Sequence, residues 1–396
     1  MTATLTKYHR LRNDVIRHLY YNKMLTLTDL SKLTHKSLPL VTGIVNDLVQ
    51  DGYVVEHGLA PSTGGRRALT FLLNKEKQKF IVAVSVDQLI TTVVIYDMLN
   101  NIQVEPAKVY LNLADEQTSM ALFISFITGY IAKSGISEEQ ILGIGIGMPG
   151  VINAKLGVNH TFFKIKNEGN LKNYLSDALK FPVYIDNDSS LIALAELKFG
   201  EGRNMKDVMV VNIGWGIGLG MIINGDIFRG HSGYAGEFSH IPLSQSNKLC
   251  SCGKRGCLEV DTSLLVLVER AKAEIAAGIS SRLEQLFLDD SKLPGEHFLI
   301  AARDGDPLAV SILSDAAFLI GKGLSTLIHI LNPELIVLGG RGATAGKIFM
   351  APIQHAINEF CIPRLADHTK ISVSASAERS ELLGAAILVV ENCQFN

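Results

Sequence analysis

The chain has few of the features that mark membrane or secreted proteins. No apolar run among its 396 residues reaches the roughly 20 residues of a membrane span, and the polar start, MTATLTKYHRLRND, contains no signal-peptide core. Cysteine is scarce and odd in number, with five residues, which does not suit a disulfide framework. These absences predict a globular protein of the reducing cytoplasm, without a membrane partner.

Charged residues are also few, at 19% of the chain against 47% hydrophobic residues. Such a chain folds well, and its length predicts two or three domains. The net charge of −2 hides an uneven distribution, because residues 1–74 contain nine Lys and Arg against five Asp and Glu, whereas the remainder contains 28 against 34. A basic end on an acidic chain indicates nucleic-acid binding at that end only.

Three of the five cysteines lie close to a histidine in the sequence, as His240, Cys250, Cys252 and Cys257. Three thiolates and one imidazole form a closed tetrahedral set for a structural Zn²⁺ ion. The alternative is three buried or idle cysteines and a core histidine, which is less favoured because the spacing C-x-C-x4-C with flanking glycines rarely arises by chance. Glu237 and Glu259 lie on either side of the cysteines, and two carboxylates fixed by a metal loop suit a polyhydroxylated ligand.

The run GEFSH at residues 236–240, followed by CSCGKRGCLE at residues 250–259, resembles the zinc signature of the ROK family of sugar kinases and sugar-responsive repressors. The resemblance implies an α/β body with the actin-like, ribonuclease-H-like ATPase fold in two lobes, and a zinc loop at residues 240–257. Whether the chain is a kinase or a regulator depends on its other segments.

Residues 1–74 have the pattern of three helices followed by a β-hairpin. Apolar residues at helical spacing predict helices over about residues 7–22, from Thr26 or Thr28 onward, and from Ser37 to Gly52. Strands at residues 53–56 and 68–73 flank the loop HGLAPSTGGRR. This order is that of a winged helix-turn-helix domain, which ROK repressors carry and ROK kinases usually lack.

The residues expected to contact DNA lie in the turn before the third helix, on the outward face of that helix, and at the tip of the hairpin. The third helix presents small or neutral groups there, which suit close approach to a base edge or a phosphate, and paired arginines at the hairpin tip suit a DNA groove. These residues are Lys36, Ser37, Pro39, Thr42, Asn46, Arg66 and Arg67. The alternative is a small three-helix interaction module with a solvated loop.

A charged connector at residues 75–79 separates this domain from the body. Paired strands at residues 80–87 and 91–97 are mirrored by strands at residues 208–213 and 221–223, as in the two halves of an actin-like fold. The prediction is an N-terminal lobe over residues 80–199 and a C-terminal lobe over residues 200–396, closed by a final helix at residues 382–390.

Both segments that cradle phosphate in ROK kinases are altered. The first kinase turn reads Asp-x-Gly-Gly-Thr, but here Asp87 is followed by Gln-Leu-Ile, whose side chains take the space that glycine leaves free. The second loop, at residues 212–220, has Trp215 in place of the kinase threonine. A lone tryptophan is more often core packing, but inside a glycine loop it favours a plugged phosphate site. The sequence therefore predicts no kinase activity.

The sugar side of the family's site is complete by resemblance. Its residues are Asn187, Asp188, Glu237, His240 and Glu259. In the kinases this aspartate takes the proton from the attacking hydroxyl, so Asp188 would be a vestigial base. The G-x-G-x-x-G run ending at Gly150 leads into an extended segment rather than a helix, which excludes a dinucleotide site. Residues 150–168 depart from the family's Pro-Asn-Leu pattern, so the sequence does not specify the sugar.

Together these features predict a sugar-responsive DNA-binding transcription regulator of carbohydrate metabolism. It would be a repressor that a sugar or sugar derivative releases from operator DNA, and it would act as a homodimer or tetramer because a palindromic operator requires symmetry. Two alternatives remain. One is a ROK kinase that phosphorylates a hexose or N-acetylhexosamine with ATP, and the other is a regulator controlled by a second protein, with a vestigial sugar cleft.

Overall fold

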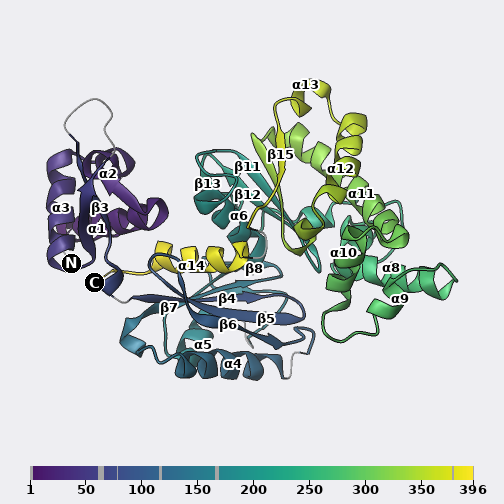
Figure 1. Cartoon of the computed structure of the whole chain (residues 1–396), viewed down its shortest axis with the longest axis horizontal. Helices are drawn as coiled ribbons and strands as arrows, with labels where there is room; N and C mark the ends of the chain where they lie inside the picture. Colours follow the sequence, from purple (N-terminus) through teal and green to yellow (C-terminus); the bar gives the residue numbers. More distant parts are fainter. Residues whose placement is uncertain are drawn as a thin grey trace. The chain divides into compact units, whose positions relative to one another are not determined.

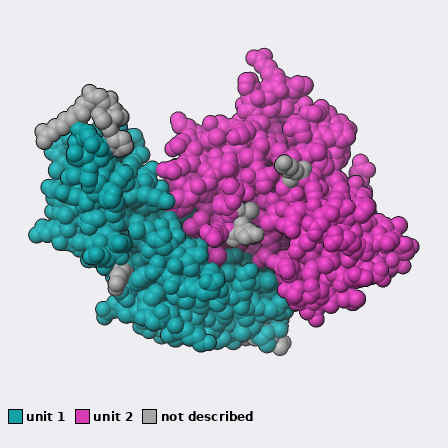
Figure 2. All heavy atoms as spheres, in the orientation of Figure 1, with its two compact units in different colours: residues 1–146, 163–185, 385–396 teal, residues 147–162, 186–384 magenta. Residues whose placement is uncertain are grey.

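The structure is a computed structural model. It describes residues 3–60, 67–77, 79–115, 118–165, 169–376 and 379–395, with the backbone alone for residues 3–5 and 347. Figure 1 shows its helices and strands, coloured along the sequence. The chain forms two units (Figure 2): unit 1 contains residues 1–146, 163–185 and 385–396, and unit 2 contains residues 147–162 and 186–384. The division into four functional segments at residues 74, 79 and 199 stays a prediction.

The N-terminal part of unit 1, called the head here (residues 3–73), has three helices and a three-stranded sheet in the order β1-β3-β2. This confirms the order helix, helix, helix, hairpin, although the short strand β1 had no signal in the sequence. The elements are α1 (Ala3–Asn22), β1 (Met24–Thr26), α2 (Leu27–Thr34), α3 (Leu38–Gln50), β2 (Val54–Leu59) and β3 (Leu69–Leu73).

Local chemistry explains where the helices of the head begin and end. The Thr26 hydroxyl accepts the Asp29 N–H, and the Asp29 carboxylate accepts the Thr26 N–H, which is a capping box at the start of α2. His35 ends α2 in the left-handed conformation, with φ of 54°. Ser37 occupies the N-cap position of α3 as expected, but its hydroxyl makes no capping hydrogen bond.

The body of unit 1 is built on a five-stranded sheet in the order β10-β7-β4-β5-β6, with two helices. Strands β4 and β5 pair antiparallel from Phe80 opposite Asp97 to Val86 opposite Thr91. The elements are β4 (Phe80–Val86), β5 (Ile90–Asp97), β6 (Ile102–Tyr110), α4 (Ser119–Lys133), β7 (Ile141–Met148), α5 (Leu171–Leu179) and β10 (Val183–Asn187).

Unit 2 repeats this plan with the sheet β13-β12-β11-β14-β15, in which β11, β14 and β15 are parallel neighbours. The repeat confirms the actin-like class of fold. Its strands and its hairpin are β8 (Ile152–Asn153), β9 (Val158–Asn159), β11 (Val208–Ile213), β12 (Ile217–Ile223), β13 (Asp226–Ile227), β14 (Leu335–Gly339) and β15 (Lys370–Val373). Its longer helices are α6 (Asp188–Phe199), α8 (Leu264–Ala276), α10 (Pro294–Arg303), α11 (Pro307–Leu331) and α12 (Lys347–Phe360).

Two helices of unit 2 show why particular residues are needed. Helix α6 lies so close to β12 that a Cβ atom on Gly220 would come within 2.3 Å of the Ser189 carbonyl oxygen, so only glycine fits. Helix α11 is long and apolar enough to cross a membrane, but 56% of its most apolar window is buried inside the protein, as in a core helix.

The last helix departs from the sequence-based expectation. It was expected at residues 382–390 as an element of the second lobe, but α14 runs from Ser380 to Asn392, and its residues from Ala385 onward belong to unit 1. The apolar run ILVV within it predicts burial but not the unit in which the burial occurs. The unit in which this run is buried depends on contacts with residues far from it in the sequence.

The core of the head gives a matched test of burial on one helix. Leu48 on α3 is fully buried, whereas Leu40 on the same helix is 48% exposed. We expect Leu48→Ala to lower the free energy of unfolding of the head by about 2–5 kcal/mol, because it leaves a cavity. Leu40→Ala removes the same atoms from a solvated position and should cost less than about 0.5 kcal/mol. Hydrogen exchange of the α3 amides measures both, and equal losses would contradict the packing described here.

Candidate functional site

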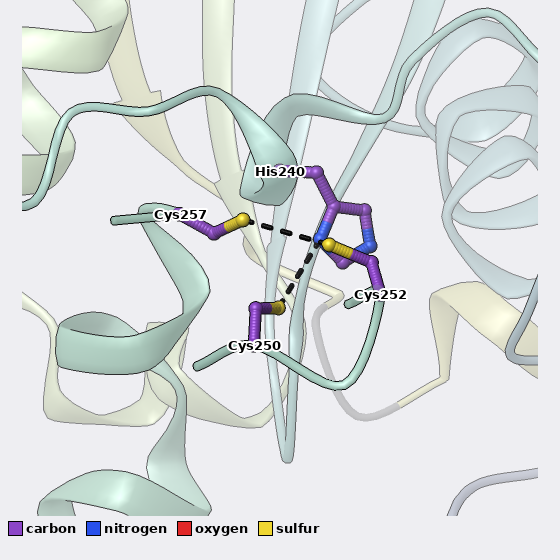
Figure 3. Close-up of side chains that lie close together, drawn as sticks. All are labelled: His240, Cys250, Cys252 and Cys257. Atoms are coloured by element: carbon purple, nitrogen blue, oxygen red, sulfur yellow. Dashed lines mark hydrogen bonds between the residues drawn. The ribbon is translucent and has the colours of Figure 1, made fainter. Parts of the chain in front are cut away.

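The clearest candidate site is a cluster of four side chains in unit 2 (Figure 3) that could bind a metal ion. It consists of His240, Cys250, Cys252 and Cys257. One ligand atom of each lies within 4.8 Å of the others. The sequence-based expectation that these four side chains converge is therefore confirmed.

Tight local turns bring the cluster together. A short 3₁₀ turn, η4 (Phe238–His240), ends at the histidine, and the cysteines follow in a loop. The Cys250 N–H donates to the Lys254 carbonyl at 2.8 Å, and the Gly253 N–H donates back to the Cys250 carbonyl at 2.9 Å. Gly253 has φ of +82°, a conformation that side chains rarely adopt, so the glycine is needed for this reversal.

The electrostatics of the cluster favour a cation. Burial and the neighbouring sulfurs raise the pKa of the Cys257 thiol to about 12, whereas the Lys254 N–H lowers the pKa of Cys252. Because the thiolate is the form that binds a metal, an ion in the cluster would displace the proton that Cys257 holds without it. Burial also lowers the pKa of His240, which keeps its imidazole neutral and able to act as a ligand. The arrangement can hold a metal.

Glu237 links this cluster to a group of carboxylates. The His240 Nδ1 atom lies 3.5 Å from the Cys250 sulfur, while its Nε2 atom lies 3.7 Å from a Glu237 carboxylate oxygen. A ligand imidazole whose second nitrogen faces a carboxylate is a common arrangement around protein-bound metals. Burial raises the pKa of Glu237.

Glu259 lies beneath the glycine loop between β11 and β12. Its carboxylate accepts the Ile217 N–H at 3.0 Å. Burial is the main cause that raises the pKa of Glu259, and the negative charges of Asp188 and Glu237 raise it further. The three carboxylates therefore share one region of unit 2 and interact with one another.

Asn187 and Asp188 stand at the start of α6. The Asn187 side-chain oxygen caps the helix by accepting the N–H groups of Ser189 and Ser190 at 3.0 and 3.3 Å, and its amide donates to the Gly150 carbonyl at 3.3 Å. The Asp188 carboxylate accepts the Ser189 N–H at 2.7 Å. The residue that caps α6 is therefore Asn187.

Sequence reasoning missed some partners of these residues. Asn212, known only as the first residue of the glycine loop, donates to Asp188 at 3.2 Å. Arg229 pairs with the buried Asp186, directly before Asn187. The His160 imidazole lies 2.9 Å from the Tyr234 hydroxyl, which joins the β8–β9 hairpin to the loop before Glu237. The departure of residues 150–168 from the family pattern was the one sequence signal for this contact.

Trp215 lies in the glycine loop and packs against α10. It is 4% exposed, and a Cβ atom on Gly295 of α10 would lie 2.5 Å from its ring. Nearby, Arg341 pairs with Glu296 of α10 at 3.0 Å. The indole N–H is buried and has no hydrogen-bond partner among the described residues.

The predicted DNA-contacting residues lie on an exposed surface of the head. Lys36, Ser37, Pro39 and Asn46 are exposed and Thr42 is half-buried, with its hydroxyl donating to the Leu38 carbonyl at 2.8 Å. Arg67 is exposed but donates to the carbonyls of Ala60 and Leu59, at 2.8 and 3.4 Å. Arg66 lies outside the described residues.

A helical head with a β-hairpin, joined to an actin-like body that carries a His-Cys₃ cluster, defines a class of proteins that combine a winged helix-turn-helix with a sugar-kinase-like fold. The ROK family model matches residues 103–392. This chain belongs to the ROK family.

Individual relatives differ in how much of the chain they match. The xylose repressor of Caldicellulosiruptor bescii is 29% identical over 383 residues, which cover 96% of this chain and 94% of the repressor. The glucokinase of Halalkalibacterium halodurans is 32% identical over 259 residues, which cover 64% of this chain and 77% of the kinase. Among solved structures, this chain is similar to the crystal structure of a ROK family transcriptional regulator, a homologue of the Escherichia coli MLC protein. The two have a TM-score of 0.77 at 24% sequence identity, and the match covers 97% of this chain and 96% of that protein. This similarity supports the fold.

Packing of Trp215 can be tested with two substitutions at one position. We expect Trp215→Ala to lower the free energy of unfolding by about 3–5 kcal/mol, because it opens a large cavity between the glycine loop and α10. Trp215→Phe keeps most of the ring and removes the unpaired N–H, so it should cost less than about 1.5 kcal/mol. Urea unfolding followed by circular dichroism measures both, because each substitution removes the only tryptophan. Similar costs for the two variants would show that Trp215 does not fill this space.

Proposed function

We propose that this chain is a sugar-responsive transcriptional repressor, whose affinity for operator DNA falls when a sugar or sugar derivative binds in unit 2. The observation that carries the proposal is the presence, in one chain, of a helix-turn-helix head with an exposed α3 and a cluster of carboxylates beside a His-Cys₃ site. The chain-long similarity to a xylose repressor supports it, because the glucokinase similarity extends over only 64% of the chain.

The DNA-binding surface in this proposal is the exposed face of α3 with the turn before it. Lys36 would bind a phosphate, Asn46 would contact a base edge in the major groove, and the Thr42 methyl group would contact a thymine methyl, because its hydroxyl already bonds the helix. Ser37 and Pro39 would allow close approach of the backbone. Arg67 would fix the shape of the wing through its bonds to the strand carbonyls, and Arg66 would contact a groove or a phosphate.

The effector site in this proposal consists of Asn187, Asp188, Glu237, His240 and Glu259. Carboxylate oxygens accept hydrogen bonds from sugar hydroxyls, and a sugar with a misplaced hydroxyl would leave a desolvated carboxylate without a partner. This accounts for selectivity without any chemical step. Catalysis is not proposed, since Trp215 occupies part of the loop that binds phosphate in the kinases, and Asp188 would be a vestigial base.

Zinc is the metal that best fits the cluster. Zn–S bonds of about 2.3 Å and Zn–N bonds of about 2.1 Å in a tetrahedron place ligand atoms about 3.6–3.8 Å apart. The Cys252 and Cys257 sulfurs are 3.6 Å apart, and the Cys250 sulfur is 3.5 Å from His240 Nδ1. With four protein ligands the ion would have no open position, so its role would be structural. It would fix Glu237 and Glu259 through the residues beside them.

A homodimer or tetramer in the cytoplasm completes the proposal. A symmetric assembly would present two heads to a palindromic operator, and the change that a sugar causes would shift the population of the DNA-binding arrangement. The kinase and the protein-controlled regulator are then outcomes of the experiments below.

The proposal is tested with the full-length protein and DNA that it selects from a random duplex library. We expect enrichment of a palindromic sequence, and a loss of affinity of about 5–150-fold for Asn46→Ala, equivalent to 1–3 kcal/mol for a lost base contact. Asn173→Ala, the same change at an exposed position on α5, should leave affinity unchanged.

Xylose, glucose, N-acetylglucosamine and their phosphates are then screened by thermal shift, and each sugar that stabilises the protein is added to the DNA-binding assay. Lower operator affinity with a sugar supports the proposal. Turnover of ATP with any of these sugars would establish the kinase instead, and DNA binding that no sugar changes would favour control by a protein.

The zinc assignment predicts about one zinc ion per chain in the purified protein. Cys250→Ser should remove most of this zinc and lower the midpoint of thermal unfolding, because the remaining ligands lose affinity and the loop loses its crosslink. Cys361→Ser changes a buried cysteine outside the cluster and serves as the control. Metal analysis of the three proteins measures the effect, and equal zinc in wild type and Cys250→Ser would refute the assignment.

A further inference from the structure

Helix α14 (yellow in Figure 1) belongs to both units of the protein. Its first turn, Ser380–Gly384, is part of unit 2, and the segment from Ala385 to the end of the chain is part of unit 1. The contacts at each end lie within one unit, and they differ in kind.

In unit 2, the first turn of α14 is hydrogen-bonded to a buried carboxylate of α6. Glu196 of α6 is fully buried, and one of its carboxylate oxygens accepts the hydroxyl protons of Ser374, Ser376 and Ser380, at 2.5, 3.4 and 3.1 Å. The other oxygen accepts the Glu201 N–H at 3.0 Å. Because a buried carboxylate without these donors would be costly, Ser380 holds the first turn of α14 to α6, while Ser374 and Ser376 hold the segment before the helix.

The backbones of the two helices also touch. A Cβ atom on Gly384 would lie 2.1 Å from the Leu191 carbonyl oxygen, so α14 rests directly on α6 at this point. Helix α6 begins at Asp188 and contains Glu196 two turns later. The proposed sugar-binding aspartate and the attachment of α14 are thus parts of one rigid helix.

In unit 1, the end of α14 is capped by the head. Helix α14 has no basic residue in its own last turn. Arg17 of α1 instead donates from Nε to the Val390 carbonyl at 3.0 Å and from a terminal nitrogen to the Glu391 carbonyl at 2.6 Å. A guanidinium on the free carbonyls of a helix end satisfies them and complements the helix dipole.

Further bonds join α1 to the last residues of the chain. Burial raises the pKa of Tyr21 well above its usual range, so its hydroxyl stays protonated and donates to the Glu391 carboxylate at 2.5 Å. Asn13 donates to the Gln394 side chain at 2.9 Å. Arg12 donates to the Phe395 carbonyl at 3.4 Å and to Asp51, the residue that ends α3, at 2.6 Å. The C-terminus therefore contacts the head beside α3, the proposed DNA-reading helix.

We propose that α14 transmits the state of the effector site to the DNA-binding head, with Glu196 and Arg17 as the positioning residues at its two ends. That a sugar binds at the effector site and DNA at the head rests on the proposed function. A shift of α6 on sugar binding would move the first turn of α14 with it. The hydrogen bond from Ser380 to Glu196 and the close approach of Gly384 to Leu191 prevent the two helices from sliding past one another. The far end of α14 would carry this shift to α1.

The first test needs no effector. Hydrogen exchange is measured in full-length wild type, Glu196→Gln, Arg17→Gln and the control Arg270→Gln, which removes an exposed arginine that pairs with Asp315. Both Glu196→Gln and Arg17→Gln should increase exchange in residues 385–392 and in α1, even though Glu196 lies in unit 2. The control should leave both segments unchanged. Wild-type exchange of α1 in a folded Glu196→Gln protein would overturn the proposal.

The second test measures coupling as the ratio of the operator Kd with saturating sugar to the Kd without it. In the wild type we expect a ratio of about 10 or more, within the usual range for allosteric proteins. In Glu196→Gln and Arg17→Gln the ratio should fall to about 2 or less, while the Kd for the sugar changes by no more than about threefold. Arg17→Lys, which keeps the charge but cannot contact both carbonyls in the same way, should be intermediate. An unchanged ratio in folded variants overturns the proposal. A wild type without any sugar response defeats the proposed function instead, and the exchange experiment then decides the role of α14.

Discussion

The structure of unit 2 depends on holding like charges together. Asp188, Glu237 and Glu259 are close enough for their charges to interact, and burial raises the pKa of both glutamates. Such a group is unstable unless donors are fixed around it. The Ile217 N–H donates a hydrogen bond to Glu259. Asp188 accepts hydrogen bonds from the Asn212 side chain and from the Ser189 N–H at the start of α6. A divalent ion bound by the three thiolates and the neutral imidazole of the adjacent cluster would not neutralise these carboxylates, because the loaded cluster keeps a net negative charge. Its contribution would be to fix the loop that positions Glu237 through the contact between Glu237 and His240.

Helix α6 connects this group of carboxylates to the rest of the fold. Its N-terminal end bears Asp188, and its other end bears the buried Glu196, whose partners come from residues 374–380. A carboxylate at each end constrains the helix along its whole length, and glycines at positions 220 and 384 let a strand and a second helix lie directly against it. A tightly packed element of this kind moves as a body, because its neighbours cannot absorb a change locally.

Sequence reasoning succeeded where the signal was local. The His-Cys₃ spacing and the Thr26 cap depend on neighbouring residues, and the structure has both. It failed for contacts between distant residues. Nothing around Glu196 indicates three serines almost 180 positions later, and nothing in α1 indicates that Arg17 caps the last turn of α14. The short strand β1 has only three residues and forms because β3 pairs with it.

The contrast between the two sides of the glycine loop bears on how a kinase fold becomes a regulator. A kinase must leave room for a nucleotide and must move between open and closed states around it. Here the Trp215 ring lies against Gly295, so the loop is joined to α10 by packing. The same helix is held to the turn that follows β14 by the ion pair between Arg341 and Glu296. Glu259, one of the three carboxylates, contacts the end of the same loop by accepting the Ile217 N–H. With the loop held by Trp215 against α10 and by Glu259 at Ile217, we expect a ligand bound by the carboxylates to act through α6, which begins at Asp188.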